Sequence, residues 1–496
     1  MKKIWISLIY FLCPSLSFAQ LNCDTELFSG IVDIEISDIS QKSDPVNHCE
    51  ITGVIGTELQ FRLWLPESWN GKFVMGGGGG FAGTLGNQAL QQGVLESGYA
   101  TVSTNTGHSG FGANWALNNL ERITNYGHAG VHRVAVESKR MIADFYEDSI
   151  DRSYFFGCSN GGRQALMEAQ RYPNDFDGIV AGAPAYNFTG LMAGFLTTQQ
   201  AMFPDPAQLQ DPLLSVSELE IVEREYLNQC DVNDGLQDRI LNNPTSCNFD
   251  VTDLPSCSAV DDDSCFTESE IAALKVVYDG PTDNQGNSLF YGFPFGGEAE
   301  AGGWPAWITG GAQPDSPNPY PNAHHFFAAE LMKYMVFHDA GFDYSGYNMD
   351  EYMNDTRPVS PTLVANSPDL SAFRDQGGKL IMYQGWSDAA ITALGTIGYY
   401  EEVLESDASA ADDVRLFMMP GVLHCAGGRG PSYVRFVDAL DEWVESGDAP
   451  DSLQANFLDE NFSPDGGRPL CAFPEEAIYD GSGSDRDPVN FQCEAP

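Results

Sequence analysis

Basic residues are scarce in this sequence: 24 Lys and Arg stand against 70 Asp and Glu, so the formal net charge is −46 at pH 7. A charge of this sign repels phosphate backbones and anionic lipids, which argues against nucleic acids and membranes as partners. No run reaches the roughly 18 apolar residues that a transmembrane helix requires, and we find no internal repeat. What remains is a chain of 496 residues, 43% of them hydrophobic, which is enough for a large core and one sizeable insertion.

The N-terminus predicts export. Lys2 and Lys3 precede an apolar run from Ile4 to Leu12, and Ser17-Phe18-Ala19 supplies the small residues that a signal peptidase recognises. We therefore expect residues 1–19 to be a signal peptide. The mature chain would then reach the periplasm or the extracellular space, and the sequence does not choose between the two.

The cysteine count agrees with an oxidising compartment. Of eleven cysteines, Cys13 leaves with the signal peptide, and the other ten form an even set that suggests five disulfides. The sequence does not determine the pairing, although three pairs would close short loops. The ten are Cys23, Cys49, Cys158, Cys230, Cys247, Cys257, Cys265, Cys425, Cys471 and Cys493, and the short loops would join Cys230 to Cys247, Cys257 to Cys265, and Cys471 to Cys493.

Short apolar runs alternate with segments that carry apolar residues at helical spacing. This alternation predicts an α/β fold in which a mostly parallel sheet is covered by helices. The expected strands are 72–75, 99–102, 154–156, 178–180, 379–383 and 415–418, and the clearest helices are 131–146 and 163–171.

The alternation stops near Phe188 and resumes near Leu370. The segment between them is rich in Pro, Gly, Asn and Asp and contains four cysteines. We expect residues 188–365 to form a lid domain, inserted into a catalytic domain made of residues 20–187 and 366–496. Because ligands bind beyond the carboxyl ends of parallel strands, a lid at that edge would contribute to substrate specificity.

Gly157-Cys158-Ser159-Asn160-Gly161 matches the G-x-S-x-G pattern of a nucleophile elbow. An apolar strand precedes it and a helical segment follows. The glycines allow a turn sharp enough to lift the serine hydroxyl above the sheet edge. An ordinary glycine-rich turn is the alternative, which the flanking strand and helix disfavour.

A serine hydroxyl needs a base to accept its proton. In this type of fold the acid and then the histidine follow the serine along the chain. Asp388 follows the predicted strand 379–383, and His424 follows the strand 415–418. Either residue alone is weak evidence, but their order and positions predict a triad of Ser159, Asp388 and His424.

Two cysteines flank this predicted triad. Cys158 directly precedes Ser159, and Cys425 directly follows His424. A disulfide between them would fix the position of the base relative to the nucleophile, whereas two bridges to other partners or two buried thiols are the alternatives.

A tetrahedral intermediate also needs hydrogen-bond donors for its oxyanion. The backbone N–H of Asn160 is one candidate. The glycine run 76–80 follows an early strand, and its residues Gly79 and Gly80 are candidates for the second donor. A phosphate-binding loop is excluded, because no Lys-Ser or Lys-Thr pair follows the glycines.

The remaining histidines are weaker candidates for the base. His48, His108, His128 and His132 precede the elbow, although His108 could still line the site. His324-His325 lacks partners at metal-ligand spacing, and we expect the pair at the surface; His338 has no supporting pattern.

These motifs resemble the tannase and feruloyl esterase family, which includes mono(hydroxyethyl) terephthalate hydrolase, over nearly the whole mature chain. The likeness rests on residues 157–163, on Asp-Phe-Asp-Gly-Ile-Val-Ala-Gly-Ala-Pro at 175–184, on Gly385-Trp386-Ser387-Asp388, and on His424-Cys425. The resemblance implies an α/β-hydrolase fold, the triad named above, and a disulfide between Cys158 and Cys425. Gln384 and Asn160 depart from the family's frequent His and Thr, and we expect both to contact the substrate pocket or its rim.

The family also carries a structural calcium site in its lid. By that resemblance Asp231, Asp234 and Asp238 would supply side-chain oxygens here, and Leu236 and Ile240 backbone carbonyls. Three carboxylates around a glycine turn suit a hard cation such as Ca²⁺. A solvated acidic turn is the alternative.

The predicted activity is hydrolysis of an ester through an acyl-enzyme on Ser159. The resemblance favours hydroxycinnamate esters such as feruloyl esters, including those on plant polysaccharide, then gallate esters, then terephthalate monoesters. Four lid aromatics are candidates for stacking on an aromatic acid, unless they form the lid core: Trp304, Trp307, Phe326 and Phe327. A peptidase with the same triad, or a calcium-stabilised binding protein with an inactive site, are the interpretations from other classes.

Overall fold

The computed structural model describes residues 23–24, 28, 31–209, 211–257, 264–310 and 320–496. The predicted signal peptide lies outside the described residues. No described helix is long and apolar enough to cross a membrane.

The core of the molecule is a sheet in the order β1-β2-β3-β5-β4-β6-β7-β8-β9. Strands β4 to β9 pair in parallel, whereas β1, β2, β3 and β5 pair antiparallel in succession. The parallel strands are buried on both faces, as the near-continuous apolar runs predicted. The bounds are β1 Ile34–Lys42, β2 His48–Ile55, β3 Leu59–Pro66, β4 Lys72–Gly76, β5 Ala100–Thr104, β6 Arg152–Cys158, β7 Gly178–Gly182, β8 Lys379–Gly385 and β9 Val414–Met419.

Helices flank this sheet, which together with the strand order gives the α/β-hydrolase fold. Helix α2 packs against β3 and β5, α3 against β6 and β7, α12 against β8, and α13 against β7 and β8. All six predicted strands and both predicted helices are confirmed, with ends shifted by a few residues. The helices outside the long insertion are α1 Leu120–Thr124, α2 Gly130–Tyr146, α3 Asn160–Arg171, α12 Ala393–Ser406 and α13 Phe436–Ser446.

The antiparallel strands at the two ends of the chain were not predicted. Strand β2 alternates buried and half-buried residues, which is the pattern of a strand with one face on the core. The C-terminal part forms two hairpins outside the main sheet: β10 Ser452–Leu458 with β11 Pro464–Cys471, and β12 Glu476–Tyr479 with β13 Phe491–Glu494.

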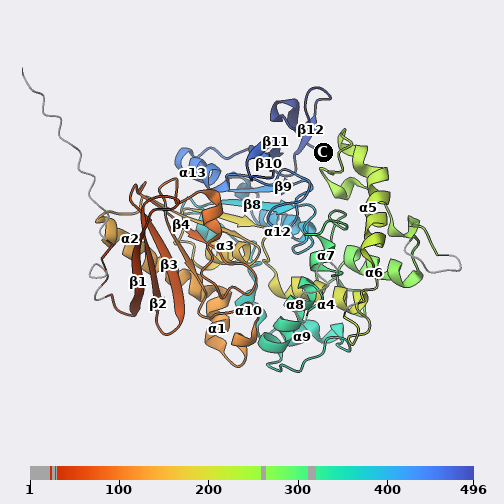
Figure 1. Cartoon of the computed structure of the whole chain (residues 1–496), viewed down its shortest axis with the longest axis horizontal. Helices are drawn as coiled ribbons and strands as arrows, with labels where there is room; N and C mark the ends of the chain where they lie inside the picture. The colour runs from red at the N-terminus through yellow and green to blue at the C-terminus, as the bar shows by residue number, and fades with distance from the viewer. Residues whose placement is uncertain (1–22, 25–27, 29–30, 210, 258–263, 311–319) are drawn as a thin grey trace, which may run out of the picture.

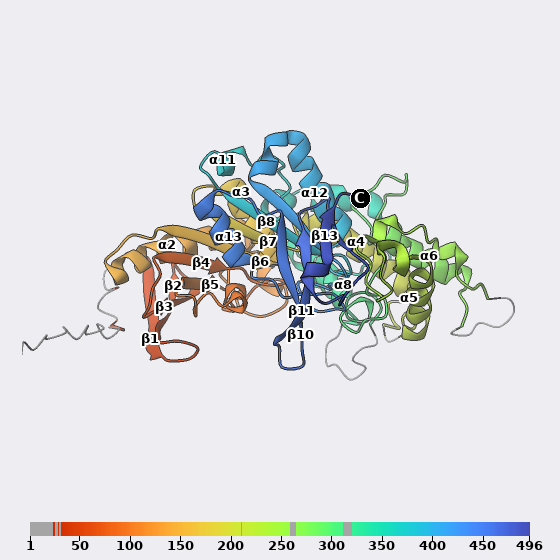
Figure 2. The same ribbon diagram turned by 90° about the horizontal axis from the view of Figure 1, so that it is seen from above.

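The chain between β7 and β8 consists of helices joined by loops, and no named strand lies in its described residues. Most of its helices, from α4 to α9, lie on the opposite side of the molecule from β1–β3, whereas α10 and α11 lie nearer the sheet (Figures 1 and 2). The first of them, α4, begins at the residue where the predicted lid begins, and packs against α6 and α8. Whether residues 188–365 are a separate domain stays a prediction. The helices are α4 Phe188–Met202, α5 Val216–Cys230, α6 Glu268–Asp279, α7 Trp304–Trp307, α8 Ala323–Leu331, α9 Tyr352–Thr356, α10 Ser360–Leu363 and α11 Ser371–Arg374.

The ten cysteines of the predicted mature chain form five disulfides. Three of them close the short loops noted in the sequence, and the other two join Cys23 to Cys49 and Cys158 to Cys425. The Cys158–Cys425 bridge spans a sequence separation of 267 residues, and it connects the end of β6 to the loop after β9.

Candidate active site

Ser159 occupies the sharp turn between β6 and α3. Its backbone has φ +65° and ψ −124°, a conformation that L-residues rarely adopt. The turn is possible because its neighbours are glycines. A Cβ added to Gly157 would lie 2.4 Å from the carbonyl oxygen of Gly161, and one added to Gly162 would lie 2.3 Å from that of Gly182. This is the geometry of a nucleophile elbow, which presents a serine at the carboxyl edge of the sheet.

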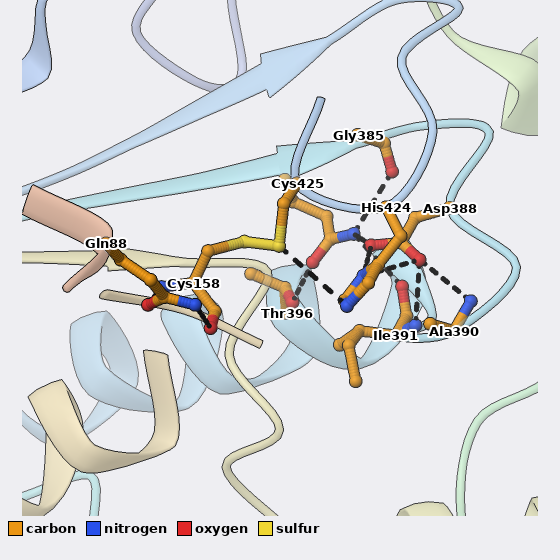
Figure 3. The surroundings of a disulfide bond; sticks show 10 residues. Gln88, Cys158, Gly385, Asp388, Ala390, Ile391, Thr396, His424 and Cys425 are labelled. Atoms are coloured by element: carbon orange, nitrogen blue, oxygen red, sulfur yellow. Dashed lines mark hydrogen bonds and ion pairs between the residues drawn. A yellow bond between two sulfur atoms is a disulfide. The ribbon is translucent and has the colours of Figure 1, made fainter. Parts of the chain in front are cut away.

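Asp388 and His424 are hydrogen-bonded to each other (Figure 3). His424 Nδ1 lies 2.9 Å from Asp388 Oδ2 and 3.1 Å from Oδ1. The carboxylate is buried, and its Oδ1 accepts hydrogen bonds from the backbone N–H groups of Ala390 and Ile391. Asp388 is therefore held in one orientation, and it can hold the imidazole with Nδ1 toward it and Nε2 away from it.

Gln384 stands behind this pair and not in a substrate pocket. Its side chain is fully buried, and its Nε2 donates to Asp388 Oδ2 at 3.0 Å, while Thr396 Oγ1 donates to its Oε1 at 2.9 Å. The expectation that Gln384 contacts the substrate is wrong. Gln384 lies near the end of β8, four residues before Asp388, and from there its amide reaches the Asp388 carboxylate.

The Cys158–Cys425 disulfide joins the elbow to the histidine loop. The two Cα atoms lie 6.0 Å apart, and Cys425 Sγ is 3.8 Å from His424 Nε2 (Figure 3). The residue before Ser159 and the residue after His424 are thus covalently linked, which brings the two predicted catalytic side chains to the same place in the fold.

The glycine run after β4 lies beside the elbow. The N–H of Gly78 donates to Gln164 Oε1 at 3.0 Å, and its carbonyl accepts from Asn160 Nδ2 at 2.9 Å. Gly80 and Asn160 border the cavity that contains Ser159. Their position fits the predicted role of their backbone N–H groups as oxyanion donors.

Arg163, on the first turn of α3, was missed by the sequence reasoning. Its guanidinium is fully buried and donates to Asn160 Oδ1 and to the carbonyls of Tyr126, Gly127 and Leu363. Burial lowers the pKa of Arg163, although an arginine remains charged at any physiological pH. The pattern G-x-S-x-G-G-R shows that a cation follows the elbow, but not that it points inward.

A cavity that is open to solvent lies beside Ser159. Two of the four aromatic candidates line it, namely Trp307 and Phe327, and the ring of Trp307 also packs against His424 at 4.9 Å between centroids. Trp304 does not reach the cavity, because it is 1% exposed and packs against Tyr278 in the interior of the helical segment. Phe326 packs against Phe81 and Tyr320 instead. The cavity is lined by Gly80, Ser159, Asn160, Ala185, Phe188, Leu191, Met192, Phe195, Trp307, Phe327, Ala390 and Ile391.

The His324-His325 pair is buried, so the expectation of surface residues is wrong. His324 stacks on Phe195 at 3.7 Å, its Nε2 lies 2.8 Å from the carbonyl of Ala389, and burial lowers its pKa to about 3. His108 is also buried and stacks on Trp115, and it does not border the cavity. His324 and His108 are therefore neutral residues of the protein interior. Their burial depends on how the helices pack, which the sequence spacing does not show.

The predicted calcium loop is a tight turn with partly buried carboxylates. Burial, with the charges of Asp238 and Asp231, raises the pKa of Asp234 to about 6, and the carboxylate accepts backbone N–H groups of Leu236 and Asn242. Asp238 is paired with Arg468. The three carboxylates do not all gather within 4.8 Å of one another in the described chain. The oxygen donors and the desolvated charge suit a hard cation, and the site stays a prediction.

The predicted calcium loop, residues 231–240, also contacts the loop that carries His424. Ile240 packs on Gly421, where an added Cβ would lie 3.2 Å from Ile240 Cγ2. This loop is far from the triad in sequence, whereas the fold brings Ile240 against Gly421, which lies in the same loop as His424.

The fold, the elbow and the acid–histidine pair define a hydrolase of the α/β-hydrolase class. The family model "Tannase and feruloyl esterase" matches residues 44–494, and the chain belongs to this family.

Mono(2-hydroxyethyl) terephthalate hydrolase of Piscinibacter sakaiensis is 31% identical over 90% of this chain and 85% of its own length. Feruloyl esterase B of Aspergillus niger is 30% identical over 90% and 87%. The crystal structure of feruloyl esterase B from Aspergillus oryzae matches with a TM-score of 0.84 at 25% identity, covering 95% of this chain and 99% of that one. The protein is a carboxylic ester hydrolase.

Proposed function

We propose that the protein is an exported serine esterase that hydrolyses esters of aromatic acids through an acyl-enzyme on Ser159. The observation that carries this proposal is the linkage of three features: Ser159 on a strained elbow, His424 hydrogen-bonded to Asp388, and the disulfide that joins their neighbours. A serine, a base and an orienting acid are the groups that acyl transfer requires.

In the first half of the reaction, His424 Nε2 accepts the hydroxyl proton of Ser159 as the serine oxygen attacks the ester carbonyl. Asp388 keeps Nδ1 protonated and stabilises the imidazolium that forms. The N–H groups of Asn160 and of Gly79 or Gly80 receive the oxyanion. His424 then gives its proton to the leaving alcohol, and the acyl group stays on Ser159.

In the second half, water repeats these steps. His424 accepts a proton from the water, hydroxide attacks the acyl carbonyl, and the Ser159 oxygen leaves as it regains the proton. The products are the free acid and the restored serine.

Hydroxycinnamate esters are the first choice of substrate, free or on plant polysaccharide, ahead of gallate esters and terephthalate monoesters. The support is the cavity beside Ser159, whose aromatic side chains Phe188, Phe195, Trp307 and Phe327 can pack against a planar ring. The relatives named above are a feruloyl esterase and a terephthalate monoester hydrolase, and this supports an ester of an aromatic acid as the substrate class. Five disulfides support export, and the loop 231–240 would bind calcium as a structural ion.

The test is turnover of methyl ferulate, methyl gallate and a terephthalate monoester by the purified mature chain, beside Ser159→Ala. Ser68→Ala, which removes an exposed hydroxyl, is the matched control. We expect turnover in the wild type and the control and a loss of roughly 10⁴-fold or more in Ser159→Ala. Turnover that survives Ser159→Ala would exclude the triad.

A further inference from the structure

We propose that the cavity selects esters whose acid part is an uncharged aromatic ring with few hydroxyl groups, and that it discriminates against acids that carry a second carboxylate. This proposal rests on the proposed function, because it concerns the acid that Ser159 would bind. It is carried by the chemistry of the cavity lining.

The acid part and the alcohol part of the ester point to different sides of Ser159. The ester carbonyl must lie at Ser159, with its oxygen toward the amides of Asn160 and the glycine loop. His424 gives a proton to the alcohol, so the alcohol leaves on the histidine side. His424 does not line the cavity, and Trp307 contacts His424 on one side and lines the cavity on the other. We therefore infer that the ring attached to the carbonyl carbon is the part that enters the cavity.

The side chains that meet this ring are apolar. Apart from Ser159, Asn160 and the indole N–H of Trp307, the side chains that line the cavity carry no polar group. Asn160 is already engaged, because its Nδ2 donates to the carbonyl of Gly78 and its Oδ1 accepts from Arg163. A ring with several hydroxyls would give up its bonds to water, and besides Ser159 and Asn160 the lining side chains offer it a single donor, the indole N–H of Trp307.

A carboxylate on the ring would meet no cation. No Lys or Arg lines the cavity in the described chain. Arg163 is the buried cation nearest in sequence to Ser159, and its guanidinium donates to Asn160 and to backbone carbonyls. His324 lies behind Phe195 and is neutral, since burial lowers its pKa to about 3. A buried carboxylate without a partner is strongly disfavoured.

The net charge of −46 adds a second, weaker penalty for an anionic substrate. This long-range repulsion is screened by salt, whereas the cost of burying a carboxylate in an apolar cavity is screened much less. The two effects can therefore be separated by ionic strength.

The decisive comparison uses dimethyl terephthalate and monomethyl terephthalate, which share the ring and the scissile ester and differ in one charge. At 0.5 M NaCl, which shortens the screening length to a few ångströms, we expect kcat/KM for the diester to exceed that for the monoester roughly 100-fold or more.

A second series tests the number of ring hydroxyls. We expect kcat/KM to fall in the order methyl benzoate, methyl 4-hydroxybenzoate, methyl gallate. A monoester within tenfold of the diester, or a preference for methyl gallate, would overturn the proposal. No turnover of any ester would overturn the proposed function and this selectivity with it.

A gain-of-function pair tests the same idea from the protein side. Met192 lines the cavity, and Met192→Lys would add a cation of similar length, whereas Met192→Gln adds polarity without charge. We expect Met192→Lys to raise the ratio of monoester to diester turnover about tenfold over Met192→Gln. An equal ratio in two folded variants, checked by circular dichroism, would contradict the proposal. If Met192→Lys does not fold, the substrate pair on the wild type still decides.

Discussion

The guanidinium of Arg163 donates two hydrogen bonds to the side-chain oxygen of Asn160, at 2.6 and 3.0 Å. The same Asn160 donates from Nδ2 to the carbonyl of Gly78. The elbow helix is thereby tied to the glycine loop that faces Ser159. From these bonds we predict that Arg163 and the Asn160 side chain are positioning groups, which hold the backbone donors of the elbow and the glycine loop.

We predict that Asn160→Ala lowers kcat about tenfold or more with little change in KM. The variant keeps the backbone N–H at position 160 but loses the side-chain bonds to Gly78 and Arg163 that hold the oxyanion donors in place, and such donors contribute mainly in the transition state. Steady-state kinetics on a neutral aromatic ester measures this split. Asn366→Ala, an exposed asparagine, is the control. A rise in KM at constant kcat would instead show that Asn160 serves substrate binding.

Removal of the Cys158–Cys425 bridge should reduce both stability and activity. The double variant Cys158→Ala/Cys425→Ala should lose about 2–4 kcal/mol of unfolding free energy, and kcat should fall roughly tenfold because His424 loses its fixed position relative to Ser159. Denaturant unfolding and kinetics measure the two effects. Cys471→Ala/Cys493→Ala removes a bridge between β11 and β13, and it should cost stability while kcat stays as in the wild type.

Gln384→Leu tests whether the residue supports the acid or the substrate. Its amide donates to Asp388 Oδ2, and the buried side chain does not border the cavity. We predict a fall in kcat of about tenfold at unchanged KM, since a less well oriented Asp388 weakens the base in every substrate complex. Gln376→Leu, which alters an exposed glutamine before β8, is the matched control. If kcat/KM changed by different factors for different esters, Gln384 would instead contact the substrate.

Calcium removal should destabilise the protein in a pH-dependent way. Burial raises the pKa of Asp234 to about 6. In the ion-free protein, folding therefore favours the protonated carboxyl: this adds to the free energy of unfolding at pH values below the ordinary pKa of an aspartate, and the addition is lost as the pH rises through 6. Calcium binds the ionised carboxylate. We therefore expect Ca²⁺ to raise Tm, measured by thermal unfolding against EGTA, more at pH 7.5 than at pH 5.

The variant Asp234→Asn should abolish most of this calcium effect, and Asp253→Asn, at an exposed position of the same segment, should not. An equal calcium effect at both pH values, or none at either, would exclude Asp234 as a ligand.

The linear order of motifs was enough to place the elbow, the acid and the base at strand ends. Ser159, Asp388 and His424 each follow a predicted strand that the structure confirms. Strands of a parallel sheet deliver their following loops to one edge, so local patterns at strand ends converge in space without any knowledge of packing. The flanking cysteines added a contact between residues 267 positions apart.

Side-chain surroundings away from those strand ends depended on packing. Gln384 and His324 were each assigned to the wrong environment from the sequence, because burial is set by which helix or loop lies against the residue. For Trp304 the sequence left the substrate pocket and the lid core open, and packing decided for the interior. Arg163 shows the same point. The motif gives its position after the elbow, but only the packing shows that its guanidinium is buried and donates to the carbonyls of Tyr126 and Leu363.

The sequence by itself determined the class of sheet, the elbow and the candidate triad, because each is written in a local run of residues with its own backbone requirement. Only the tertiary structure decided which aromatic rings line the cavity, that no cation does so in the described chain, and that the calcium loop touches the histidine loop through Ile240 and Gly421. Those relationships join segments far apart in the chain, and close packing of the interior, not local propensity, sets them.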